Sequence, residues 1–112
     1  MLKKQDRLTK KKDLEEVRLK GSMVQSSLFG LNYLKGKEER KFGFIVSKKI
    51  SKRAVDRNRI RRLLAESVRI NMDKIDINIW GVFLAKKSLL GKKFREVEEE
   101  LGRVFKQLII NN

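Results

Sequence analysis

The 112-residue chain contains no cysteine, no histidine and no proline. Without cysteine there is no disulfide and no thiolate chemistry, and without cysteine and histidine there is no zinc site of the Cys/His type. A lack of cysteine fits a reducing compartment. Because proline is absent as well, the glycines provide most of the breaks between elements.

Long hydrophobic runs are also missing. No stretch approaches the roughly 20 apolar residues needed to span a bilayer. The basic N-terminal sequence MLKKQDRLTKKKDL is not followed by the apolar run of a secretory signal. We therefore expect a cytoplasmic protein that has no membrane partner.

Acidic residues are few compared with basic ones. Lysine and arginine total 29 against 14 aspartates and glutamates, so the net charge is +15 and the pI about 10.4. Such an excess on a small body favours a polyanionic partner, with nucleic acid the first candidate and an anionic membrane surface the second. The hydrophobic content of 40% is enough for a core, and the length suggests one domain over residues 1–112.

Periodicity predicts three helices and a small sheet. Apolar residues recur at helical spacing over 10–20, 55–71 and 93–109. Period-two alternation or a short apolar run predicts strands within 23–34, 42–46 and 80–85. This order is typical of an α+β protein, here a two-layer α-β sandwich in which a small, mostly antiparallel sheet of about four strands packs against three helices.

The strand patterns also predict how the sheet is paired. Residues 29–33 alternate between large apolar side chains and Gly30 or Asn32, so these two are expected on the open face of the sheet. A polar turn then leads to residues 42–46, which predicts a hairpin of the two strands. The strand at 80–85 follows a helix and is expected to run parallel to its predecessor.

The most unusual stretch is the basic segment between residues 48 and 69. It holds nine lysines and arginines against Asp56 and Glu66. A charge run is usually a solvated helix face, but this one lacks alternating signs and places arginines near a helix N-terminus, where the macrodipole disfavours cations. We therefore predict a phosphate-binding surface formed by Lys48, Lys49, Lys52, Arg53, Arg57, Asn58, Arg59, Arg61, Arg62 and Arg69.

The sequence offers no candidate for a protein-based catalytic or metal centre. It has no histidine, and its carboxylates are not clustered as in a nuclease. Asp56 and Glu66, ten residues apart on a basic helix, are interpreted as local charge partners. Trp80, at the start of a strand, is interpreted as a core or sheet-edge residue rather than a platform for base stacking.

The stretch FGFIVSKK, together with AVDRNRIRRLLAE a few residues later, resembles the protein subunit of bacterial ribonuclease P. The signature of that family is an arginine-asparagine-arginine motif that follows Ala-Val and leads into a basic helix. The matching residues are Arg57, Asn58 and Arg59, then the basic pair Arg61 and Arg62 and the closing acid Glu66. The flanking stretches KKKDLEEVRLKGS and VFLAKKS resemble the family's first helix and last strand.

The resemblance implies a single RNA-binding domain with an accessory role in a ribonucleoprotein. In that family the enzyme removes the 5′ leader of precursor tRNA, the catalyst is the RNA subunit, and Mg²⁺ is bound mainly by that RNA. The protein binds the catalytic RNA through its basic helix and loop, and it holds the leader on the open face of the sheet. The resemblance also implies a left-handed crossover between the parallel strands, against the general rule. We further expect the free protein to be monomeric.

The leader cleft implied by the resemblance would be lined by Leu14, Arg18, Gly30 and Asn32. Leu14 and Arg18 stand where the family usually has phenylalanines, and Asn32 stands where a tyrosine often occurs. Ala65 replaces an arginine, which would remove one cation from the outer face of the helix. Because stacking contributes about 1–3 kcal/mol per base, leader binding here is expected to depend less on stacking and more on charge.

Three other functions fit parts of the sequence. A small structural RNA-binding protein of ribosomal type would share the charge and the fold, and the RNA that copurifies would distinguish it. A free-standing ribonuclease would cleave RNA without an RNA subunit, which the missing acid/base pair argues against. A membrane-surface protein would need tryptophan or phenylalanine on the apolar stripe of the basic helix, which has neither.

Overall fold

The computed structural model describes residues 2–75 and 78–110, and it places their side chains as far as residue 108. The helices are α1 (Lys11–Lys20), α2 (Ala54–Asn71) and α3 (Phe94–Ile110), and the short 3-10 turns are η1 (Lys4–Asp6), η2 (Met72–Lys74) and η3 (Lys87–Leu89). The strands are β1 (Ser22–Gln25), β2 (Phe29–Lys35), β3 (Lys41–Ile45) and β4 (Ile79–Ala85). The predicted α+β fold is confirmed, and each of the three α-helices begins and ends within one residue of its predicted bounds.

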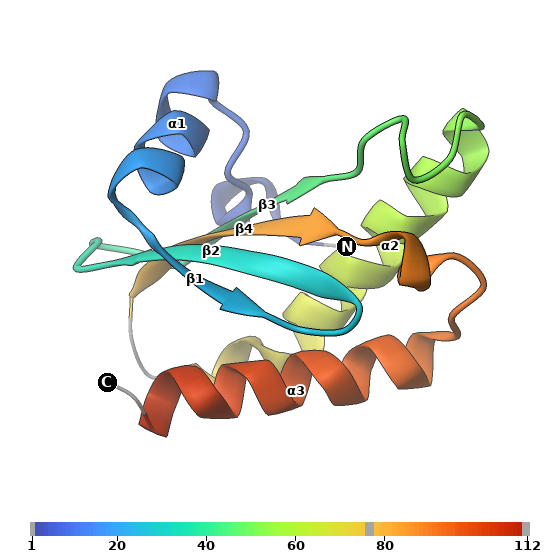
Figure 1. Cartoon of the computed structure of the whole chain (residues 1–112). Helices are drawn as coiled ribbons and strands as arrows, with labels where there is room; N and C mark the ends of the chain where they lie inside the picture. Colours follow the sequence, from blue (N-terminus) through green and yellow to red (C-terminus); the bar gives the residue numbers. More distant parts are fainter. Residues whose placement is uncertain (1, 76–77, 111–112) are drawn as a thin grey trace.

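The strand β4 lies inside the sheet, between β2 and β3. The strand order is β1-β2-β4-β3, with β4 antiparallel to β2 and parallel to β3 (Figure 1). The parallel pairing was predicted correctly, but the predicted hairpin of β2 and β3 is wrong because β4 separates them. The hairpin forms instead between β1 and β2. The physical reason is that β4 is apolar along its length and packs on both faces, which favours a position between two neighbours.

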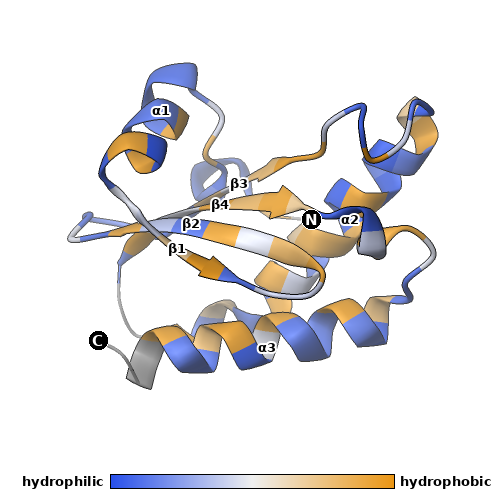
Figure 2. Cartoon of the chain, viewed as in Figure 1, coloured by the Kyte–Doolittle hydropathy of each residue, from blue (hydrophilic) through white to orange (hydrophobic). Residues whose placement is uncertain are grey.

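The main core lies between one face of the sheet and the helices α2 and α3 (Figures 1 and 2). Its centre is Phe83 of β4, which is fully buried. The ring of Phe83 lies 5.2 Å from that of Phe29 and 5.5 Å from that of Phe44, measured between centroids, and the pair with Phe44 is stacked. These aromatic contacts hold the three longest strands together and also place Phe44 beside α2.

The helix α1 covers part of the opposite face of the sheet (Figure 1). Val17 of α1 and Val82 of β4 are buried there in a second, smaller cluster, and Trp80 packs against its rim. The ammonium of Lys37 lies 4.1 Å from the centre of the Trp80 ring and 2.6 Å from a carboxylate oxygen of Glu16. Trp80 is therefore a packing residue at the sheet, as the sequence predicted.

The N-terminal segment is folded against the edge of the sheet. Leu2 and Leu8 are both buried, and the backbone N–H of Leu8 donates to the carbonyl of Phe42 at 2.8 Å. The guanidinium Nε of Arg7 donates to the carbonyl of Leu2 at 3.0 Å. This segment therefore covers the first part of the β3 edge and brings Arg7 toward α2.

A polar clip ties the turn between β1 and β2 to α3. The hydroxyls of Ser26 and Ser27 both donate to one carboxylate oxygen of Glu100 at 3.0 Å, and Nε of Arg103 donates to the other at 2.6 Å. These donors, with Arg103 the largest contribution, lower the pKa of Glu100 to about 2. On the other side of the turn, Nζ of Lys86 donates to the carbonyl of Ser26 at 2.5 Å.

The clip predicts a pH-dependent contribution to stability. Because the pKa of Glu100 is lower in the folded state, its stabilisation is present above the unfolded value near 4.5 and is lost as pH falls toward about 2. At neutral pH the free energy of unfolding of the Glu100→Gln variant is expected to be about 1–2 kcal/mol lower than that of the wild type, allowing for solvent screening.

This expectation is checked by urea denaturation at several pH values, with Glu99→Gln as the matched control. Glu99 lies on the exposed side of α3 with only a 3.7 Å ion pair to Arg95, so its loss should change stability by about 0.5 kcal/mol or less. The difference in free energy of unfolding between wild type and Glu100→Gln should become smaller as pH falls from about 4.5 toward 2. A gap that stays constant over this interval would contradict the assigned role.

Candidate RNA interface

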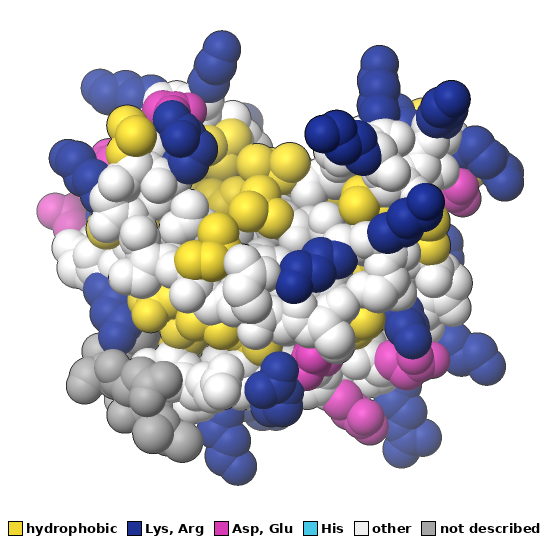
Figure 3. Space-filling model, viewed as in Figure 1, with side chains coloured by type: hydrophobic (Ala, Val, Ile, Leu, Met, Phe, Trp, Pro, Cys, Tyr) yellow, Lys and Arg dark blue, Asp and Glu magenta, His cyan; other side chains and the backbone are white. Residues whose placement is uncertain are grey.

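The predicted phosphate-binding residues gather at one end of the molecule, except Arg69. The loop between β3 and α2 and the first half of α2 form this end, and Figure 3 shows dark-blue side chains projecting from it. The two segments meet because α2 begins at Ala54, directly after the loop. The cations of the loop and of the helix therefore form one surface, called here the basic cluster: Lys48, Lys49, Lys52, Arg53, Arg57, Asn58, Arg59, Arg61 and Arg62.

Ser51 organises the loop that leads into α2. Its hydroxyl donates to Oδ2 of Asp56 at 2.8 Å and accepts from the backbone N–H of Arg53 at 3.2 Å. The guanidinium of Arg57 donates to the carbonyl of Ser51 at 2.8 Å. Arg53 lies 3.9 Å from the Asp56 carboxylate, so Asp56 is the local charge partner that the sequence predicted. These contacts hold the loop against the first turn of the helix.

Apart from Arg53, which is ion-paired with Asp56, the cations of the basic cluster fall into two groups. Arg57, Arg59 and Arg61 use a guanidinium N–H to hold a protein oxygen, which in the case of Arg59 is the carbonyl of Lys92 at 2.9 Å. The other group has no hydrogen bond or ion pair to another described residue and is exposed to solvent: Lys48, Lys49, Lys52 and Arg62. The first group shapes the surface while keeping its charge, and the second presents free cations.

Arg69 lies apart from the rest of the predicted set. It follows Arg62 by seven residues, which is about 10 Å along a helix. Its guanidinium donates to Glu66 at 2.5 Å and 3.0 Å. This pairing raises the pKa of Arg69, and it is the largest of the causes that lower the pKa of Glu66 to about 2. Much of its charge is therefore compensated locally, as the sequence predicted for Glu66.

Ala65 is buried, which corrects its expected place on the outer face of α2. Its exposure is 6%, and it belongs to the main core together with Leu2. Both residues line a small hollow of about 140 Å³, whose other walls include Arg62 and Phe44. The N-terminal segment therefore covers this part of the helix.

The four predicted cleft residues do not share one accessible surface. Gly30 is buried, because Met23 and Gln25 lie over it at 3.3–3.4 Å from the position of a Cβ. Asn32 is on the predicted face but is only 8% exposed. Arg18 is exposed and paired with Glu15. Leu14 is half-buried and faces Gly43 of β3, so it alone among the four lines an open hollow.

That hollow lies along the free edge of β3. It has a volume of about 310 Å³, and it is lined by Arg7, Leu8, Thr9, Leu14, Phe42, Gly43, Phe44, Ile45 and Arg61. Ile45 is 44% exposed, and Figure 3 shows hydrophobic side chains in the depression between α1 and the basic cluster. We call this hollow the apolar trough. Its floor is apolar, and Arg7 and Arg61 stand at its side.

Two cations near the interface, Arg7 and Lys92, could not be found from the sequence. Arg7 lines both hollows together with Arg61, because the N-terminal segment folds along β3. The loop after β4 comes beside α2 through the bond from Arg59 to the carbonyl of Lys92. This contact places Lys92 near the basic cluster. No local pattern marks these residues, because only the folding of distant segments brings them there.

The arrangement suits a single-stranded polyanion that carries aromatic groups. Free cations bind phosphates, and the trough offers apolar surface to bases. Within residues 2–75 and 78–110 no three carboxylate, histidine or cysteine side chains lie close enough together to hold a metal ion. In the same part of the chain no helix is long and apolar enough to cross a membrane.

Comparison with known proteins assigns the family. The family model for ribonuclease P matches residues 2–109. The ribonuclease P protein component of Desulfosudis oleivorans is 37% identical, with 92% of this chain and 85% of that protein covered, and the one from Pelotomaculum thermopropionicum is 36% identical with 95% of each covered. The solved structure of the Staphylococcus aureus RNase P protein superposes with a TM-score of 0.82 at 25% identity, covering 96% of this chain and 98% of that one. The chain therefore belongs to the ribonuclease P protein family, whose members are protein components of the ribonucleoprotein that matures the 5′ end of tRNA.

Proposed function

We propose that this protein is the accessory subunit of a cytoplasmic ribonuclease P, and that the RNA subunit carries catalysis. The observation that carries this proposal is the group of free cations, Lys48, Lys49, Lys52 and Arg62, beside an apolar trough. Such a surface binds RNA but has no group placed to move a proton or to activate water. The cleavage chemistry is therefore assigned to the partner RNA.

Mg²⁺ would be held mainly by that RNA. The carboxylates near the basic cluster are already engaged, because Asp56 accepts from Ser51 and Glu66 accepts from Arg69. The contribution of the protein is instead to neutralise phosphates where RNA segments approach one another, so that fewer metal ions are needed to screen them.

The two parts of the interface are assigned different partners. The basic cluster would bind the catalytic RNA, since its free cations project into solvent over a convex helix end. The apolar trough would bind the leader of the precursor tRNA, since its volume of about 310 Å³ admits one base beside Phe44 and Ile45. A structural protein of ribosomal type would use the same cluster without any effect on leader removal.

The proposed function predicts that the protein lowers the Mg²⁺ requirement of leader removal. We expect a bacterial ribonuclease P RNA to cleave precursor tRNA at Mg²⁺ concentrations where the RNA alone is inactive, once the protein is added. The measurement is initial cleavage rate across a Mg²⁺ titration with and without protein. Identical titration curves would contradict the proposal. Cleavage of precursor tRNA by the protein without RNA would contradict the assignment of catalysis to the RNA subunit.

A free cation and a paired cation of α2 are predicted to contribute differently to the salt dependence of RNA affinity. Arg62→Ala removes a free cation, so the slope of log affinity against log salt should flatten by about one contact, or roughly 0.7–0.9. Arg69→Ala is the control, because Arg69 is paired with Glu66 and lies away from the cluster. Its slope should change by less than half as much. Equal slopes for the Arg62→Ala and Arg69→Ala variants would contradict the difference between free and paired cations. Arg57→Ala should in addition lower the melting temperature, because Arg57 donates to the carbonyl of Ser51.

The trough predicts that an aromatic residue at position 14 strengthens leader binding. Leu14→Phe would add a ring beside Gly43 and Ile45, and stacking should tighten binding of precursors with leaders of several nucleotides by about 1 kcal/mol. Mature tRNA should bind unchanged. The matched control is Leu19→Phe, on the same helix but 68% exposed and outside the trough. If both variants bind long and short leaders in the wild-type ratio, the leader does not cross this trough.

A further inference from the structure

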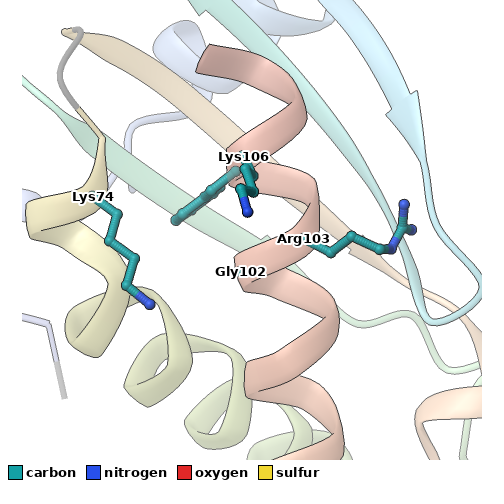
Figure 4. Close-up of a pocket in the computed structure, with 5 residues that line it drawn as sticks. Lys74, Gly102, Arg103 and Lys106 are labelled. Carbon is teal, nitrogen blue, oxygen red and sulfur yellow. The ribbon is translucent and has the colours of Figure 1, made fainter. Parts of the chain in front are cut away.

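A second basic hollow lies at the other end of α2. It is a groove of about 620 Å³ between η2 and α3, lined by Lys74, Gly102, Arg103, Phe105 and Lys106 (Figure 4). The 18 residues of α2 span about 27 Å, so this groove is remote from the basic cluster at the start of that helix. None of its residues belongs to the interface described above.

Two lysines frame the groove. Figure 4 shows Lys74 reaching from η2 toward the part of α3 around Gly102, with Lys106 one turn further along α3. Both are exposed, and neither forms an ion pair with a described residue. Arg103 extends to the other side of α3, where it pairs with Glu100. The nearby carboxylates are Asp73, which is exposed, and Glu98, which accepts from Nδ2 of Asn71 at 3.3 Å.

Phe105 gives the groove apolar surface, and one unsatisfied acceptor is buried just beneath the groove. Gly102 lies in the middle of α3 at an ordinary negative φ, so it forms a notch that no turn requires. Beneath this notch, Oδ1 of Asn71 is buried without a hydrogen-bond partner, 3.5 Å from where a Cβ of Gly102 would be. A buried acceptor left unpaired is destabilising, so this atom marks a position where a donor from a ligand, directly or through one water, would be favourable.

We propose that this groove binds one nucleotide of single-stranded RNA. The phosphate would lie between the ammonium groups of Lys74 and Lys106, and the base would lie over the notch at Gly102 and the edge of Phe105. A sugar hydroxyl or a base N–H is the donor that meets Asn71. The volume is within the range of sites for small ligands, roughly 300–1,000 Å³, and the two free cations select an anion. The protein would then contact RNA on two sides.

The test is a titration of the ¹⁵N-labelled full-length protein with uridine 5′-monophosphate, followed by NMR. The backbone amide of Gly102 and the side-chain NH₂ of Asn71 report on the groove, and the amides of Arg57 to Arg62 report on the basic cluster. Saturable shifts are expected at Gly102 and Asn71. The double variant Lys74→Ala/Lys106→Ala should weaken this binding by about tenfold, and Gly102→Leu, which fills the notch without changing charge, should abolish it.

Parallel titrations with uridine, with inorganic phosphate and with an acidic peptide decide what the groove recognises. Weaker shifts with each of these than with the nucleotide support the proposal. Equal shifts with inorganic phosphate would overturn it in favour of a simple anion site, and stronger shifts with the peptide would overturn it in favour of a protein partner. Absence of saturable shifts at Gly102 and Asn71 would also overturn it. Nucleotide-induced shifts at the basic cluster should remain in both groove variants. A failure of the groove proposal can therefore be distinguished from a failure of the proposed function.

Discussion

The burial of β4 on both faces is the constraint on which the rest of the structure depends. Phe83 packs into the aromatic core on one side, and Val82 packs under α1 on the other. The strand β4 has β2 on one edge and β3 on the other, so β3 lies at the outside of the sheet, parallel to β4 and joined to it through α2. That connection leaves the part of the β3 edge beyond the N-terminal segment open, and it places the start of α2 beside this edge. The apolar trough and the basic cluster are therefore adjacent because of a packing requirement in the core.

The concentration of arginines at the start of α2 is tolerated because several of them are anchored. Like charges repel, and the helix N-terminus disfavours cations further. Arg57 and Arg59 offset part of this cost by donating to the carbonyls of Ser51 and Lys92, which also pulls two loops toward the helix. The lysines of the loop and Arg62 remain without such partners among the described residues. In the proposed function, bound phosphates would relieve the repulsion among these free cations, so the charges that destabilise the free protein would favour the complex with RNA.

The departures from the family pattern are connected through the N-terminal segment. Ala65 is small enough for the main core to extend to Leu2, which is buried in the same cluster. The segment then runs along β3, adds Arg7 to the wall of the trough and leads into α1. Ala65 removes one cation from α2 relative to the family pattern, and the N-terminal segment that packs beside Ala65 brings Arg7 to the same region. The trough contains Phe44 in its wall, although aromatic rings are missing from positions 14, 18 and 32.

The sequence by itself determined the three helices, the parallel pairing across α2 and the motif around Arg57 to Arg59. These features depend on short-range periodicity, on residue type and on a motif of adjacent residues, so they can be recognised without knowing which segments meet. Only the tertiary structure decided that β4 separates β2 from β3, that Asn32 and Ala65 are buried, and that Arg7 and Lys92 reach the interface. Each of these depends on contacts between residues far apart in the chain. Alternation along one strand shows which side chains share a face, but what covers that face is decided by the segments that pack on it.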